Sequence, residues 1–137
     1  MVVKCGVLTE HSTPAEINLY YLEDAVRSLA QPPELQQHGE EMVVDFDAWY
    51  VPAVSDGYLA DLEPDQCQAL EKIDRLLSEM TALQEPEPWT TSEALATSSW
   101  WAVVREAARD ALRILQWSPD PPESVWNKTI VGVESQE

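Results

Sequence analysis

The sequence predicts an α+β or small α/β domain, in which a short three-stranded sheet packs against about three helices. Apolar residues recur at helical spacing in three segments. Three other segments are rich in β-forming residues or alternate between apolar and polar side chains, as strands do. A mostly α-helical bundle is the alternative. The length of 137 residues is that of one domain, which we expect to span residues 1–137.

The chain is expected to begin with a strand and a helix. Valines make residues 1–9 a candidate strand. Thr13 can then cap a helix, Pro14 suits the first helical position, and Glu16 completes a capping box. Two prolines at 32 and 33 end this helix.

Residues 41–51 are expected to form the second strand. Apolar residues alternate there with Asp45, Asp47 and Trp49, so one face of the strand is apolar and the other is acidic and aromatic. The dipeptide Asp56-Gly57 marks the turn that follows.

Two more helices and a last strand complete the prediction. Helical spacing of apolar residues runs from Pro64 to Gln84 and again from Thr91 to Trp117. Thr97 falls on the apolar face of the third helix and weakens its first two turns. Residues 125–134 are expected to form the final strand.

The third helix carries two groups of residues with expected roles. Trp101 suits the core stripe, and the adjacent Trp100 suits a flank or an interface. Arg105, Arg109 and Arg113 form a row with one residue per turn. With Glu106 and Asp110 beside them, we expect these arginines to tie the helix internally to the acidic body rather than to bind a ligand.

The charge of the chain excludes several classes of function. Asp and Glu number 25 against 8 Lys and Arg, a net charge of −17 that opposes nonspecific binding to nucleic acid or anionic lipid. No apolar run approaches the roughly 20 residues of a membrane span. Cys5 and Cys67 make no disulfide framework, so a reducing, cytoplasmic location is expected.

The negative charge is concentrated in residues 28–71. This stretch holds ten acidic residues and no Lys or Arg, and therefore carries well over half of the net charge. Such self-repulsion opposes compact folding and brings no packing gain. A solvated surface is one interpretation, but a surface that meets a cationic partner is favoured, because complementary charge speeds encounter.

Aromatic residues within this stretch favour a docking site between Glu40 and Asp65. Trp and Tyr are common anchors of protein interfaces. The alternative for Trp49 and Tyr58 is that each packs under a neighbouring helix. The candidate partner-binding residues are Asp45, Asp47, Trp49, Tyr50, Asp56, Tyr58, Asp61 and Glu63.

No complete catalytic, metal or cofactor motif is present. Asp45 and Asp47 form a DxD triplet, which is common by chance in so acidic a chain. The segment from Asp61 starts like a calcium loop but has Gln66 where Gly is needed and Lys72 where Glu is needed. The two His and two Cys have no zinc-site spacing. We therefore expect no enzyme, no metal and no cofactor.

In size, charge and aromatic content the chain resembles the small acidic immunity proteins and antitoxins that neutralise cationic toxins. No motif aligns, so the resemblance assigns no residue. It implies a non-enzymatic inhibitor that binds a cationic protein, such as a toxin domain, and binds neither nucleic acid nor membrane directly. The alternatives are a nucleic-acid mimic of the anti-restriction or anti-CRISPR type and a small enzyme. The oligomeric state is left open.

Overall fold

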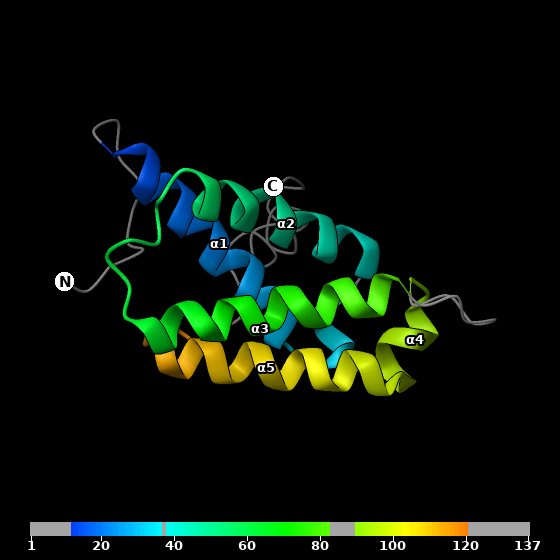
Figure 1. Cartoon of the computed structure of the whole chain (residues 1–137). Helices are drawn as coiled ribbons and strands as arrows, with labels where there is room; N and C mark the ends of the chain where they lie inside the picture. Colours follow the sequence, from blue (N-terminus) through cyan, green and yellow to red (C-terminus); the bar gives the residue numbers. More distant parts are fainter. Residues whose placement is uncertain (1–11, 37, 83–89, 121–137) are drawn as a thin grey trace, which may run out of the picture.

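A computed structural model describes residues 12–36, 38–82 and 90–120 as a bundle of helices (Figure 1). No strand occurs within these ranges, so the α+β prediction is wrong and the helical alternative is confirmed. The strands expected at residues 1–9 and 125–134 lie outside the described residues. The helices are α1 (Pro14–Ala30), the 3-10 helix η1 (Pro33–Leu35), α2 (Gly39–Ser55), α3 (Pro64–Thr81), α4 (Ser92–Thr97) and α5 (Ser99–Leu115).

Helices α1 and α5 form the centre of the bundle. Helix α1 packs against α2 and α5, and α5 packs against α3. Figure 1 shows α3 and α5 side by side and antiparallel, with α2 above α3. One apolar core joins these helices, and its largest fully buried side chains include Trp101, Phe46 and Leu22. The prediction that Trp101 lies in the core and Trp100 on a flank is confirmed.

Helix α1 begins and ends as the sequence predicts. The Thr13 amide donates to the Glu16 carboxylate at 2.8 Å, and the Glu16 amide donates to the Thr13 hydroxyl at 3.1 Å. This capping box satisfies two amides that would otherwise lack partners at the helix start. Pro32 follows the last turn and prevents its continuation.

Helix α2 replaces the strand expected at residues 41–51. Its buried residues include Met42, Phe46 and Tyr50, which are four apart. A spacing of four fits both the helical and the strand period, so these residues alone do not separate the two. Val44 decides the matter, because a strand would bury it beside Phe46, whereas it is 59% exposed. Phe46 and Tyr50 stack with ring centroids 5.1 Å apart, as an i,i+4 pair on one helix face.

The helix predicted over 64–84 is present as α3 but ends at Thr81, and the one predicted over 91–117 is divided at Ser98 and ends at Leu115. Ser98 has extended backbone angles and lies between α4 and α5. Its hydroxyl accepts a hydrogen bond from the Trp100 amide at 3.1 Å and so caps α5. Thr97, Ser98 and Ser99 favour such local hydrogen bonds over a continuous helix.

Side chains satisfy all four carbonyl groups at the end of α1. The Gln31 amide donates to the Arg27 carbonyl at 2.9 Å. The Gln36 amide donates to the carbonyls of residues 28 and 29, both at 3.0 Å. Arg109 of α5 donates to the Ala30 carbonyl at 2.9 Å. Because helix ends leave these acceptors without partners inside the helix, the side chains anchor α1 to η1 and α5.

Arg105 extends this network into the core. It is buried, and it donates to the Gln36 side chain at 2.8 Å and to the Leu95 carbonyl. Burial, and then the charge of Arg109, lower the pKa of Arg105, and the Glu34 carboxylate partly opposes this. Arg105 and Arg109 thus tie α5 to other parts of the molecule as expected, but the acceptors are carbonyls and an amide in place of the expected acidic groups.

Gly39 allows α2 to begin against the indole of Trp101. A Cβ atom at residue 39 would lie 2.8 Å from Cζ2 of Trp101. That distance is shorter than a van der Waals contact, and the indole is fully buried. A side chain at the first residue of α2 would therefore force the indole or the helix to shift.

We expect Gln36→Ala to lower the free energy of unfolding by about 3 kcal/mol, because it removes one acceptor of the buried Arg105 guanidinium and the side-chain donor to the carbonyls of residues 28 and 29. Urea unfolding followed by circular dichroism measures this loss. The control is Gln68→Ala on the exposed side of α3, which should cost under about 0.5 kcal/mol. Equal unfolding midpoints for the two variants would show that the network contributes no stability.

We expect Gly39→Ala to destabilise the protein by about 1–3 kcal/mol through its clash with Trp101. Helix propensity alone predicts the opposite sign, a gain of roughly 0.5–1 kcal/mol. Trp101→Phe shortens the ring, so Gly39→Ala should cost less in that background. A double-mutant cycle of unfolding free energies measures this coupling, and additive effects would exclude the contact.

Candidate protein-binding surface on α2

The eight predicted partner-binding residues lie on α2 and on the segment that joins α2 to α3. Because α2 is a helix, Asp45 and Asp47 are about 160° apart around its axis. The predicted strand placed them on one face together with Trp49, so that juxtaposition is wrong. Asp45 lies on the same side of α2 as Trp49, and Asp47 lies on the side toward α3.

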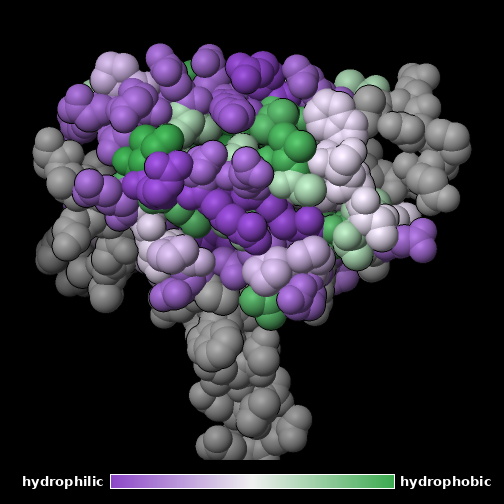
Figure 2. All heavy atoms as spheres, turned by 90° about the horizontal axis from the view of Figure 1, so that it is seen from below, coloured by the Kyte–Doolittle hydropathy of each residue, from purple (hydrophilic) through white to green (hydrophobic). Residues whose placement is uncertain are grey.

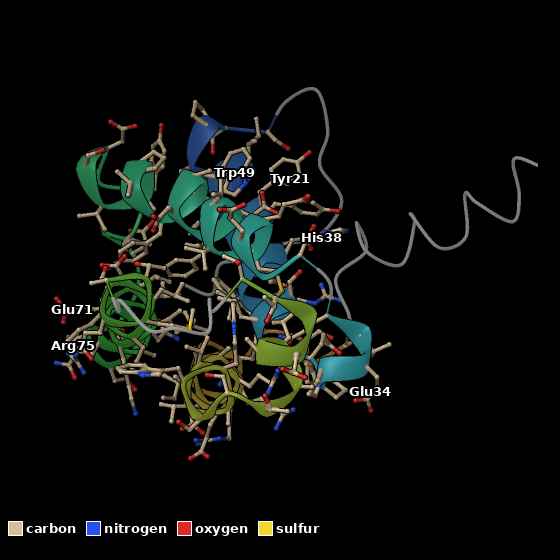
Figure 3. The ribbon with its side chains drawn as sticks, turned by 90° about the vertical axis from the view of Figure 1, so that its right-hand side faces the viewer. Tyr21, Glu34, His38, Trp49, Glu71 and Arg75 are labelled. Atoms are coloured by element: carbon tan, nitrogen blue, oxygen red, sulfur yellow. The ribbon has the colours of Figure 1, made fainter. Side chains whose placement is uncertain are left out.

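Trp49 belongs to an aromatic cluster between α1 and α2. Its ring stacks on Tyr21 of α1, with centroids 4.7 Å apart and planes 19° apart (Figure 3). Tyr20 meets Tyr21 edge to face at 5.2 Å. Asn18 donates to the Trp49 carbonyl at 2.9 Å and fixes the two helices at this point. Trp49 is half-buried and Tyr21 is 37% exposed, so the cluster both joins the helices and reaches the surface.

An apolar stripe occupies the outward side of α2. Val44, Ala48 and Val51 are all exposed, Val44 by 59% and Val51 by 56%. Their i, i+4, i+7 spacing places them on one helix face over two turns. We call these three residues the α2 stripe. The sequence prediction missed it because a strand would bury Val44 and Ala48, and the spacing signals a surface only once α2 is known to be a helix.

Carboxylates border the α2 stripe on both sides. They are all exposed, and they are Glu40, Glu41, Asp45 and Asp47. Residues 28–71, which include α2, contain no Lys or Arg. An exposed apolar centre with a polar rim is the arrangement that protein interfaces use.

The side of α2 that faces α3 is crowded with negative charge. Burial raises the pKa of Asp47. Burial also raises the pKa of Asp74, and the charges of Asp47 and Glu71 raise it further. Tyr50 is buried nearby, and burial, Asp74, Glu71 and Cys67 raise its pKa in that order. Tyr50 therefore belongs to the interior of this region, whereas Asp47 is exposed.

The other candidate residues follow α2. Asp56 and Asp61 are exposed, and Tyr58 is half-buried against the core. Gly57 between them has a positive φ of 75°, which turns the chain away from α2. Glu63 is exposed and precedes α3, where its amide donates to the Gln66 side chain at 2.9 Å. Tyr58 and Glu63 thus also stabilise the fold.

The surface of α5 differs from that of α2 in charge. Figure 2 shows the molecule from the side of α5, where most of the surface is hydrophilic and the apolar spots are separate. Acidic Glu106 and half-buried Asp110 alternate along α5 with the exposed Arg109 and Arg113. Arg113 pairs with Asp110 at 2.9 Å. Of these two helices, α2 is therefore the one that combines a continuous apolar stripe with flanks that contain acidic residues and no Lys or Arg.

Cys67 and His38 stand apart from one another. Cys67 is half-buried in α3, and its thiol lies 3.8 Å from the Leu59 carbonyl, while burial and Asp65 raise its pKa. His38 is exposed at the start of α2, away from Glu71 and Arg75 on α3 (Figure 3). Within the described ranges no three His, Cys, Asp or Glu side chains gather as ligands for a metal ion. Cys5 and His11 lie outside those ranges.

None of the helices in the described part of the chain is long and apolar enough to cross a membrane. No protein-family model, curated protein or solved structure matches the chain. Its function must therefore be inferred from its own residues and their arrangement.

We expect Asp74→Asn to raise the stability of the protein at neutral pH. A raised pKa means that folded Asp74 holds its proton more tightly than the unfolded chain does, so ionisation favours unfolding. Stability due to this group is greatest below the usual aspartate pKa of about 4 and falls as the pH rises through the folded value.

Urea unfolding of the parent, Asp74→Asn and the exposed control Glu79→Gln, measured across this pH range, tests the sign. The gain from Asp74→Asn should grow as the pH rises and should exceed that of Glu79→Gln. A loss of stability at neutral pH would show that the ionised Asp74 is favourably paired instead.

Proposed function

We propose that this protein is a non-enzymatic inhibitor that binds a basic protein through the α2 stripe and its flanking carboxylates. The observation that carries the proposal is the exposed apolar stripe, set within a stretch of the chain that has ten acidic residues and no basic one. Burying Val44 and Val51 on a partner gains hydrophobic free energy. The carboxylates guide encounter and select a cationic partner.

A second copy of the chain is a poor occupant of this surface. Pairing two α2 helices through Val44 and Val51 would bring two sets of acidic flanking residues to one interface. Like charges brought together at an interface cost several kcal/mol. The partner is therefore a different protein whose apolar residues are surrounded by Lys or Arg.

The most suitable partner is a toxin domain that this protein holds inactive, as immunity proteins and antitoxins do. A toxin that acts on nucleic acid or nucleotides needs a positively charged surface for its substrate. The acidic flanks of α2 complement such a surface, and bound α2 would exclude the substrate. The proposed place of action is the cytoplasm.

Nucleic-acid mimicry is the other function considered, and the α2 stripe argues against it. A mimic needs carboxylates that follow one another at the spacing of phosphates. On α2 the acidic residues are separated by Val44, Ala48 and Val51, which are apolar and exposed. This arrangement favours an interface with an apolar centre.

We expect the double variant Val44→Asp/Val51→Asp to lose its partner while remaining folded, because both side chains point to solvent. Loss of a central apolar contact costs about 2 kcal/mol, or roughly thirty-fold in affinity. The parent and the variant are each immobilised, and the amount of a basic protein that each retains from a lysate of the source cell is compared. The isolated partner is then titrated by calorimetry and assayed for toxicity with and without this chain.

The matched control is Val103→Asp, which adds a charge at an exposed valine of α5 and should leave affinity unchanged. Raising the salt from about 50 to 500 mM should slow association by about ten-fold, since the screening length shrinks to a few ångströms. An acidic partner contradicts the proposal. So does a partner that binds the α2 double variant and the α5 variant with the same affinity as the parent protein. If this chain releases the captured protein from nucleic acid, and that protein is not toxic, the result favours nucleic-acid mimicry instead.

A further inference from the structure

The outward side of α2 contains a hole suited to one side chain of a facing helix. Val44, Asp47, Ala48 and Val51 stand at i, i+3, i+4 and i+7, and all four are exposed. Four residues at these spacings form the hole that accepts one side chain in knobs-into-holes packing between helices. Ala48 has the smallest side chain of the four, so an entering side chain can come close to the backbone of α2.

Pro52 leaves a backbone acceptor beside this hole. Proline has no N–H group, so Pro52 cannot donate to the carbonyl of Ala48, which is its usual i−4 partner in a helix. One turn later the helical hydrogen bond to the residue four positions earlier is present, because the Asp56 amide donates to the Pro52 carbonyl at 2.8 Å. Ala48 is exposed and Pro52 is half-buried, so both residues lie on a side of α2 that reaches the surface.

Carboxylates flank the hole on both sides of the helix. Glu41 and Asp45 lie toward α1, and Glu40 and Asp47 lie toward α3. A helix that crosses α2 with an apolar stripe at its centre presents its own flanking residues to both of these groups. Lys or Arg at those positions would be attracted to these carboxylates.

We infer that the partner covers α2 with a basic amphipathic helix, which places one apolar side chain over Ala48 and a Lys or Arg donor on the Ala48 carbonyl. This inference rests on the proposed function and names the form of the partner at the same surface. A strand fits less well, because residues on one face of a strand are about 6.5–7 Å apart. Residues one helical turn apart, such as Val44 and Ala48, are spaced at about 5–6 Å and match the turns of another helix.

The probe is a fluorescein-labelled synthetic peptide of Leu and Lys whose leucines form one helical stripe. The control peptide has the same composition, with leucines placed so that no helix face is apolar. Fluorescence anisotropy should show that the full-length protein binds the first peptide at least ten-fold more tightly than the second. Equal charge in the two peptides separates helix packing from attraction between opposite charges.

Two variants test the hole and the acceptor separately. Ala48→Gln fills the hole and should weaken binding of the first peptide about ten-fold, while Ala102→Gln, at an exposed alanine of α5, should not. Pro52→Ala supplies the missing N–H group, so it should raise the unfolding midpoint and yet weaken binding several-fold. These opposite changes distinguish use of the carbonyl from general damage to α2.

The outcomes separate this inference from the proposed function. If both peptides bind equally, or if Ala48→Gln binds like the parent, the partner does not pack as a helix over Ala48, although attraction to a basic partner stands. If Pro52→Ala binds as tightly as the parent, the Ala48 carbonyl has no role. If neither peptide binds at low salt, both the inference and the docking of a basic partner on α2 are overturned.

Discussion

The carbonyl groups at the end of α1 need partners, and this need organises the centre of the molecule. Residues from three parts of the sequence supply the donors: Gln31 at the helix end, Gln36 after η1, and Arg109 of α5. Their hydrogen bonds set the direction of the chain as it leaves α1. Helix α2 then begins at Gly39 against the indole of Trp101, so its starting point is fixed by the core. With Phe46 turned inward, the side of α2 that carries Val44 must face solvent.

The same network helps to explain why the surface is so acidic. Arg105 and Arg109 are turned toward amide and carbonyl oxygens of the interior. Arg27 donates to the Asp120 carbonyl and pairs with the adjacent Glu23 at 3.2 Å. These cations donate to carbonyl and amide oxygens and pair with one buried acid. A partner that approaches α2 meets the acidic residues of a stretch, residues 28–71, that holds no Lys or Arg of its own.

The sequence predicts local features of this fold better than it predicts the identity of α2. The capping box at Thr13 and the apolar seam of α3 depend on neighbouring residues, and both are found as predicted. Residues 42, 46 and 50 satisfy two periods at once, so the choice between strand and helix depended on whether Val44 is buried. The charge of residues 28–71 did identify the region of the candidate surface. Its shape could not be predicted, because Tyr21 joins Trp49 from another helix and because a helix separates Asp45 from Asp47.

The exposure of the α2 stripe has a consequence for how such a protein can change over time. Val44, Ala48 and Val51 support no part of the core, whereas Phe46, Tyr50 and Gly39 are held by their neighbours on the other side of the same helix. Substitutions in the stripe can therefore accumulate with little penalty in folding. Descendants of one ancestral chain could keep the same bundle and acquire different partners, each defined by a few side chains over two turns. Recognition would then diverge quickly on a scaffold that changes slowly.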